Sequence, residues 1–451
     1  MTEPATAGTT PAQPNRAALR GRIATAWSSG PLAVRDFRLL GLGQLASTVG
    51  DYCYAVALPW LILSNHGSTV LLGTVLACYG VPRTVLIPLG GILSDRLSPR
   101  TIMLIADAIR CVLVAALAAI AVPKLISLAA LGPVAALLGA GEGLFLPAAG
   151  AIVPSLLPSE SLQSGNGISA AMTQVGSIAG PVIGGVLVTT LGSAPAFAVD
   201  AASFAISAIA LAMMRGRRSA SLSTESAAAD GQPAEQTTAT ATDQPTTLWR
   251  LLLRSRFLQM ILVIAVLANF AAASTIEVAL PALAHLRFGA AGYGTLIAGF
   301  GVGSLFGTLA SIKLSRARWP AQAACASFLI AAVALTGIPF LGGLPGAVAA
   351  ALVFGAGAIF GNIVMVTLLQ QWAPPAMIGR VMSAVMLASI GAYPASVALS
   401  GVIVRAVGPA PFFPVSGGVL AVVVLFALSQ REFRLFGAAD QTHVEPLAAT
   451  S

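Results

Sequence analysis

Charged residues are scarce in this sequence: Asp, Glu, Lys and Arg together make up 9% of its 451 residues, while 57% are hydrophobic. An ordinary soluble domain carries about 25% charged residues, so this chain has too little polar surface to cover a water-soluble globule. Lipid has to cover the apolar surface that polar side chains leave bare. The composition therefore excludes a soluble protein and indicates an integral membrane protein.

Cysteine and histidine are rare as well, with Cys53, Cys78, Cys111 and Cys325 and three histidines in the chain. The cysteines show no paired or metal-ligand spacing and fall inside apolar runs, where we expect them to pack as small residues. We find no nucleotide-binding Gly-rich loop with a lysine, no paired histidines and no nucleophile beside a base. We therefore predict no metal and no cofactor, and an intramembrane enzyme is disfavoured.

Long apolar runs are what the chain does have. A membrane-spanning helix needs about 20 apolar residues, and the runs here are apolar on all sides, unlike the alternating strands of about ten residues in a transmembrane barrel. We therefore predict an all-α integral membrane protein of the twelve spans 37–64, 70–93, 101–122, 125–153, 165–190, 194–214, 258–284, 293–312, 320–341, 345–370, 381–404 and 409–428.

The middle of the chain separates two halves of six spans each. Residues 219–247, rich in Ser, Thr, Gln and Pro, lie between them, and a shift of 216 residues superposes Gly91 on Gly307 and Gly185 on Gly401. Transporters commonly duplicate a six-helix unit in parallel. We predict a disordered tail, a first bundle, a linker, a second bundle and a C-terminal tail at residues 1–35, 36–215, 216–250, 251–430 and 431–451.

The basic residues predict the orientation, because cytoplasmic loops near the ends of spans carry the excess of Lys and Arg. With the N-terminus inside, the basic residues outside the spans all fall on the cytoplasmic side, except Lys124, Arg287 and Arg405. Both termini are therefore expected in the cytoplasm, and the net charge of +8 reflects topology and not a nucleic-acid partner. Abundant Ala and Arg beside scarce Lys indicate a GC-rich bacterial gene, and so a plasma-membrane protein.

Four charged residues lie near the bilayer midplane. At about 1.5 Å per residue, Asp51 is roughly 20 Å above Arg38, and Arg83, Arg110 and Glu142 lie at similar depth. Because an intramembrane charge costs roughly 2.5–3.5 kcal/mol, each is a functional candidate. Either Asp51 or Glu142 exchanges a proton while the arginines tune its affinity, or Asp51 with Arg83 and Glu142 with Arg110 are ion pairs that only lock helices together.

Polar uncharged residues occur at the same depth in both halves. Gln174, Asn269 and Asn362 lie on the fifth, seventh and tenth spans, and we expect them to line a central substrate cavity. Two further acids, Glu277 in the seventh span and Asp200 in the sixth, either join this cavity or face water at its mouth.

The turn between the second and third spans reads Gly90-Gly91-Ile92-Leu93-Ser94-Asp95-Arg96-Leu97-Ser98-Pro99-Arg100. It resembles the loop signature of the major facilitator superfamily, with Ser98 and Pro99 in place of the second glycine. That resemblance implies that the acid of this loop holds the two halves together by meeting the start of helix eleven. We expect a conformational gate made of Gly91, Asp95, Arg96, Arg100 and Arg380. Alternatively, the loop is basic only to fix the topology.

Small residues recur on the fifth span at Gly176, Gly180, Pro181, Gly184 and Gly185. Such spacing lets another helix approach closely, and the proline allows a bend. Gly299, Gly301, Gly303 and Gly307 on the eighth span offer a matching surface. The stretch resembles the antiporter motif of drug exporters in the same superfamily.

Further stretches narrow the resemblance to the branch of enterobactin exporters and macrolide efflux proteins: Asp36-Phe37-Arg38 with Gly43-Gln44 and Gly50-Asp51, Ala106-Asp107 with Arg110, Pro158-Ser159-Glu160, and Val199 to Phe204. The resemblance implies proton-driven export of a small, often amphipathic molecule, such as an antibiotic or siderophore, by alternating access. Glu142 is not typical of that branch. An uncoupled facilitator or importer is the alternative, and a channel or scramblase ranks below both. The expected partners are a small-molecule substrate and the bilayer, and nothing demands more than a monomer.

Overall fold

The computed structural model describes residues 30–65, 67–121, 127–215, 256–314, 319–372 and 378–430, and every structural statement below concerns these. They contain 12 helices long and apolar enough to cross a membrane, which confirms the predicted all-α architecture. The tail 1–29, residues 216–255 with the whole predicted linker, and the tail 431–451 lie outside the described residues.

The first bundle begins with a short 3₁₀ turn at Pro31–Ala33 and holds α2 (Arg35–Ser64), α3 (Thr69–Arg96), α4 (Pro99–Ile120), α5 (Leu128–Leu156), α6 (Leu162–Leu191) and α7 (Ser193–Met213). The second holds α9 (Arg256–Ser274), α10 (Leu280–Arg287), α11 (Gly289–Leu314), α12 (Pro320–Gly337), α13 (Gly343–Trp372), α14 (Ile378–Gly391), α15 (Tyr393–Val407) and α16 (Pro409–Ser429).

Two predicted spans are interrupted. The seventh changes from α9 to α10 through a π-helical turn at Thr275–Ala279, and the eleventh breaks into α14 and α15 beside Ala392. A proline follows each irregularity, Pro281 near the start of α10 and Pro394 near the start of α15. Proline lacks an N–H and its ring crowds the carbonyl four residues earlier, which favours an irregular turn at both points, although Pro59 and Pro181 lie inside continuous helices.

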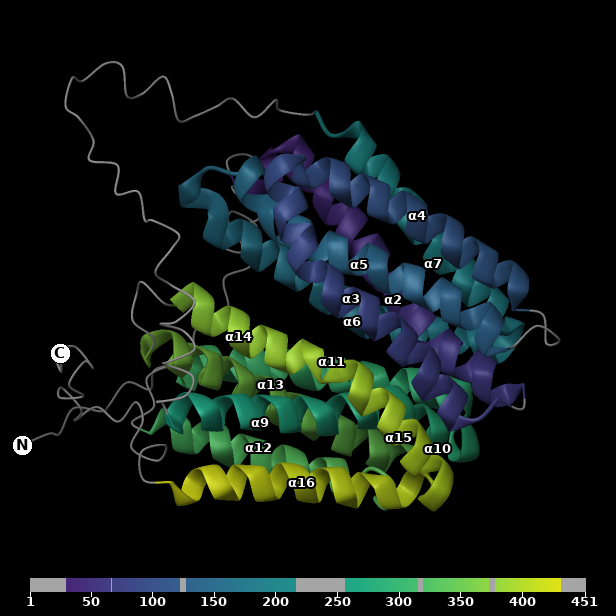
Figure 1. Ribbon diagram of the computed structural model, residues 1–451, viewed down its shortest axis with the longest axis vertical. Helices are drawn as coiled ribbons and strands as arrows, with labels where there is room; N and C mark the ends of the chain where they lie inside the picture. The colour runs from purple at the N-terminus through teal and green to yellow at the C-terminus, as the bar shows by residue number, and fades with distance from the viewer. Residues whose placement is uncertain are drawn as a thin grey trace, which may run out of the picture.

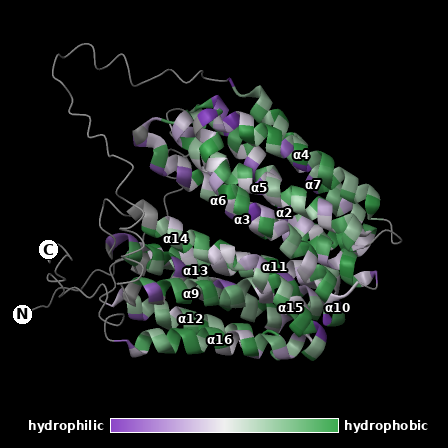
Figure 2. Ribbon diagram, viewed as in Figure 1, coloured by the Kyte–Doolittle hydropathy of each residue, from purple (hydrophilic) through white to green (hydrophobic). Residues whose placement is uncertain are grey.

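Figure 1 shows the bundles as two layers that converge at one end and separate at the other. The converging end carries the helix ends at Ser64, Leu191 and Val407, and we call it the far end. The separating end carries Met213 and Arg256, which adjoin the linker, and we call it the linker end. Hydrophobic residues predominate on the outer helix surfaces (Figure 2), including exposed Val112, Val333 and Val422. Such faces suit contact with lipid.

Two pairs of crossing helices join the bundles at the far end, α6 with α11 and α3 with α15. A Cβ added to Gly185 would lie 3.3 Å from the Cα of Gly294, and one added to Gly401 would lie 3.3 Å from the Cα of Gly73. The residues superposed by the 216-residue shift, Gly185 and Gly401, thus make equivalent contacts in the two halves. Hydrogen bonds accompany both crossings, from Ala291 N to Thr189 Oγ1 (3.0 Å) and from Thr69 Oγ1 to the Gly401 carbonyl (2.8 Å).

The same helix faces are open at the linker end. On α3, Gly80 lies against Tyr393 of the other bundle, whereas Gly91, about three turns further along that face, has no neighbouring atom within 4 Å of an added Cβ. The bundles therefore touch at the far end and lie apart at the linker end (Figure 1).

The small residues of the fifth and eighth spans make close helix contacts, but mostly with other helices than each other. Gly176, Gly180 and Gly184 all lie against α2, at Thr48, Val49 and Cys53. Of the eighth-span glycines, Gly301 meets Ser177 and Ile178 of α6, whereas Gly299, Gly303 and Gly307 pack against α13 within the second bundle. The glycines of α11 lie on two of its faces, so this helix packs closely against both α6 and α13.

A methyl group at Gly294 is expected to open the far end. The added Cβ would meet the Pro181 carbonyl oxygen, and overpacking of this kind costs about 1–3 kcal/mol. That cost falls on the closed far end, because the contact crosses from α11 to α6. We expect Gly294→Ala to raise, about tenfold, the rate at which a polar maleimide labels Val397→Cys, a fully buried position beside Gly73, in a background without other cysteines.

Gly418→Ala is the matched control, because a Cβ at Gly418 has no neighbour within 4 Å. It should leave the labelling rate unchanged. Equal labelling in the Gly294 and Gly418 variants would show that this crossing does not hold the far end closed.

Candidate functional site

A pocket with a cavity of about 40 Å³ lies inside the first bundle, at the depth of the intramembrane charges. Every helix of that bundle except α6 contributes to its walls. The lining residues are Asp51, Tyr54, Tyr79, Arg110, Val114, Leu138, Glu142, Asp200 and Phe204. The structure thus brings three of the four predicted midplane charges to one cavity, and the fourth, Arg83, contacts it through Glu142.

The ion pairing differs from the predicted one. Arg83 Nη2 lies 3.2 Å from Glu142 Oε1, so Glu142 pairs with Arg83 on α3 and not with Arg110 on α4. The reason is the close packing of α3 on α5: an added Cβ at Gly143 would meet the backbone of Arg83, which places both side chains on one level. Both partners remain about a quarter exposed, at 24% and 23%, so the pair borders a space that water can enter.

Arg110 has no carboxylate partner at ion-pair distance within the described residues, although it is only 6% exposed. Its guanidinium carbon lies 4.7 Å from the centre of the Phe145 ring and 5.5 Å from that of Phe204. Nη2 is buried without a hydrogen-bond partner in the described part of the chain. The nearby acids Asp51, Asp107 and Asp200 attract the guanidinium through space without contacting it.

Two acids that the sequence prediction ranked low or did not single out complete the cluster. Asp107 of α4 is fully buried and accepts a hydrogen bond from Ser207 Oγ at 2.6 Å, and Asp200 of α7 is 1% exposed and lies on the pocket wall. Ser203 Oγ donates to the Asp200 backbone carbonyl at 2.7 Å. Asp107 precedes Arg110 by three residues, a spacing that places both on one helix face. Counting every acid within the spans would have found both residues.

Asp51 differs from these two acids because it is exposed although it lies in the middle of α2. It lines the pocket, so its carboxylate faces the cavity. A carboxylate exposed at mid-depth in a membrane can exchange protons with water that enters from the open end.

The predicted cavity residues of the other helices do not line this pocket. Gln174 donates to the Gly301 carbonyl at 2.7 Å and so bridges α6 and α11. Asn269 is exposed and donates back to the Ala265 carbonyl of its own helix, and Asn362 is also exposed. Glu277 lies half-buried in the π-helical turn, where Arg83 of the first bundle attracts it electrostatically.

The loop between α3 and α4 is described in part. Ser98 accepts a hydrogen bond from Thr101 N at 3.3 Å as the N-cap of α4, with Pro99 in the first turn, which explains how Ser-Pro replaces the second glycine. Arg100 donates to the carbonyls of Leu211 and Ala212 at 2.7 and 2.8 Å, which ties α4 to the end of α7. Arg96 is exposed, and the side chains of Asp95 and Arg380 lie outside the described part.

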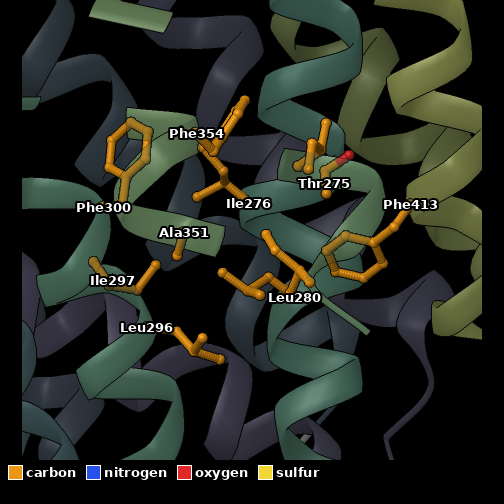
Figure 3. A pocket seen from close by; sticks show the side chains of 11 residues that line it. Thr275, Ile276, Leu280, Leu296, Ile297, Phe300, Ala351, Phe354 and Phe413 are labelled. Atoms are coloured by element: carbon orange, nitrogen blue, oxygen red, sulfur yellow. The ribbon is translucent and has the colours of Figure 1, made fainter. Parts of the chain in front are cut away.

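A second pocket, with a cavity of about 10 Å³, lies within the second bundle beside the π-helical turn. Figure 3 shows Phe300, Phe354 and Phe413 around it, with Ile276 and Leu280 between them. Thr275 contributes a hydroxyl, but that hydroxyl is bonded to the Ala271 carbonyl at 2.7 Å. This pocket is nearly filled by its own apolar side chains and offers no charge, in contrast to the pocket of the first bundle.

Comparisons with known proteins agree with this architecture. The Major Facilitator Superfamily model matches residues 40–392. The chain is 29% identical over 411 residues to the enterobactin exporter EntS of Shigella boydii serotype 4 (strain Sb227), a match that covers 89% of this chain and 93% of that one. It is also 29% identical over 192 residues to the multidrug efflux pump Tap of Mycolicibacterium fortuitum, which covers 41% of this chain and only 46% of Tap.

The crystal structure of the nucleoside transporter NupG superposes with a TM-score of 0.68 at 14% identity, over 87% of this chain and 98% of that one, and this likeness shows the fold alone. The family match and the EntS relative confirm the resemblance seen in the sequence motifs, and they indicate a transporter and not an enzyme. With its 12 candidate spans in two bundles, this chain belongs to the Major Facilitator Superfamily of multi-pass membrane transporters.

Proposed function

We propose that this transporter exports a small amphipathic molecule, such as an antibiotic, a siderophore or a related metabolite, in exchange for protons. The observation that carries the proposal is that Asp51 and Glu142 share one pocket with Arg110 at mid-depth in the membrane. Because burying a charge in the membrane is costly, charged groups at that depth are usually paired with one another or take part in function.

The two carboxylates have different surroundings and therefore different roles in this proposal. Asp51 is exposed to the cavity and has no ion-pair partner among the described residues, so a proton can reach it directly. Glu142 is held by Arg83, so protonation of Glu142 would cancel the charge that attracts the guanidinium. A proton taken up by either acid thus changes the interactions of the pocket with a substrate or with a neighbouring helix.

The orientation follows from the arginine distribution. We propose that the linker end is cytoplasmic, with both termini inside the cell and the protein in the plasma membrane, because basic residues gather at that end. The described conformation is then open to the cytoplasm and closed to the outside. The reverse state requires the far-end crossings at Gly185 and Gly401 to separate while the loop residues Asp95, Arg96 and Arg100 meet the start of α14.

Export is favoured over import by the functions of two relatives, an enterobactin exporter and a multidrug efflux pump. Energy is proposed to come from the proton gradient, without a bound cofactor. The Arg83–Glu142 ion pair favours one alternative, an uncoupled facilitator in which these charges only hold helices together.

Reconstitution into vesicles tests the proposal. Vesicles with an acidic lumen are given a panel of antibiotics and siderophores from outside, and protein-free vesicles control for the trapping of weak bases. We expect at least one compound to accumulate above its external concentration and to leak back when an ionophore collapses the pH gradient. If every transported compound only equilibrates, at the same rate with and without the gradient, proton antiport is refuted and the uncoupled facilitator is the supported function.

A further inference from the structure

The pocket of the first bundle has a surplus of negative charge. Three carboxylates line it, those of Asp51, Glu142 and Asp200, against the single guanidinium of Arg110. Arg83, which does not line the pocket, forms an ion pair with Glu142. Asp51 and Asp200 then face the single guanidinium of Arg110. Asp107, fully buried near Arg110, adds to the acidic side. In a medium of low polarity, a surplus carboxylate needs either a proton or a ligand cation.

An unused hydrogen-bond donor lies enclosed beside the pocket. Arg110 lines the wall and is only 6% exposed, yet Nη2 has no hydrogen-bond partner in the described part of the chain. A buried unpaired donor is costly, about 1–3 kcal/mol and more when it is charged. A ligand that carries an oxygen acceptor as well as a cationic group would satisfy this nitrogen once the wall moves to admit it.

The remaining walls are aromatic and aliphatic. Tyr54 and Tyr79 come from α2 and α3, Phe204 from α7, and Val114 and Leu138 from α4 and α5. Aromatic faces attract organic cations and pack against flat rings. The cavity between these walls is about 40 Å³, which has room for an ammonium group. The aromatic body of a ligand requires the walls to move apart.

Building on the proposed export function, we infer that the substrate is an organic cation: a protonated amine that also carries an oxygen acceptor and an aromatic or apolar body. The ammonium group lies between Asp51 and Asp200, the oxygen accepts from Arg110, and the ring lies against Tyr54 and Phe204. One ammonium then balances the surplus charge of the pocket wall.

Binding to the purified protein in lipid nanodiscs tests this inference without any gradient. The probes are tyramine, which has both groups, phenethylamine, which lacks the oxygen, and N-acetyltyramine and 4-hydroxyphenylacetate, which are neutral and anionic. Measured calorimetrically near neutral pH, tyramine should bind at least about tenfold more tightly than the neutral and anionic probes. Phenethylamine should be weaker than tyramine by about two- to tenfold, the effect of one hydrogen bond.

Variants assign the contacts. Asp200→Asn and Asp51→Asn should each lower tyramine affinity about tenfold or more and leave N-acetyltyramine unchanged, while Arg110→Gln should remove the difference between tyramine and phenethylamine. Asp36→Asn, an acid in the first turn of α2 and away from the pocket, is the matched control. If an Asp variant does not fold, the affinities of the four probes for the unmodified protein still show whether the site prefers a cation.

The inference is overturned if the neutral or anionic probe binds as tightly as tyramine, or if tyramine does not bind. These results are separable from the transport assay. Proton-driven export of neutral or anionic compounds by a protein that does not prefer amines would keep the proposed function and refute the cation site. Selective amine binding without gradient-driven transport would keep the cation site and refute proton antiport.

Discussion

Vesicles that carry Asp51→Asn should lose gradient-driven accumulation of substrate and fall to the level of protein-free vesicles. The amide cannot take up or release a proton, and Asp51 is the exposed acid of the pocket. The substitution keeps the size of the side chain, so the helix crossings at the far end are preserved. Exchange of labelled for unlabelled substrate, which needs no net proton movement, should continue at a measurable rate.

The assay compares Asp51→Asn with Glu142→Gln and with Asp36→Asn, which changes an acid of the same helix outside the pocket. Loss of accumulation in one pocket variant, with retained exchange, identifies the coupling carboxylate. Full accumulation in both pocket variants would contradict proton coupling through this site. Loss of accumulation in Asp36→Asn as well would indicate a general defect of the protein.

The Arg83–Glu142 pair should make a large contribution to stability. Arg83→Gln removes the charge that faces Glu142, and we expect the free energy of unfolding to fall by about 3 kcal/mol, since breaking a fully buried pair costs roughly 3–5 kcal/mol and this one is about a quarter exposed. Glu142→Gln leaves the guanidinium unpaired and should cost a similar amount. The double variant should cost less than the sum, by about 2 kcal/mol.

The cycle is measured by unfolding in mixed micelles at increasing denaturing detergent. Arg96→Gln, an exposed arginine at the linker end of α3, is the matched control and should change stability little. Additive effects of the two single substitutions would show that the ion pair is not coupled in solution. The same variants are tested for transport. If the ion pair stabilises the fold but its loss does not change substrate accumulation, the uncoupled facilitator is favoured.

Much of this architecture could be predicted because depth in a membrane is a one-dimensional quantity. The rise of about 1.5 Å per residue converts a sequence position into a height, so the twelve spans were located to within a few residues, and Asp51, Arg110 and Glu142 were correctly expected at one level. The internal repeat was also visible, and Gly185 and Gly401 do make equivalent crossings. The superfamily followed from the loop motif between α3 and α4.

The sequence did not show which face of each helix packs against its neighbours. Spans that are apolar on all sides carry no hydrophobic stripe that would mark the buried face. Only tertiary packing decided that Glu142 meets Arg83, that Asp200 and Asp107 join the charged cluster, and that Gln174 bridges the bundles. The same holds for α11, whose glycines face two different helices. The sequence by itself determined the number of spans, their depth and their charges, since these depend on local composition. The structure decided the partners, since these depend on how the helices are rotated and tilted against each other.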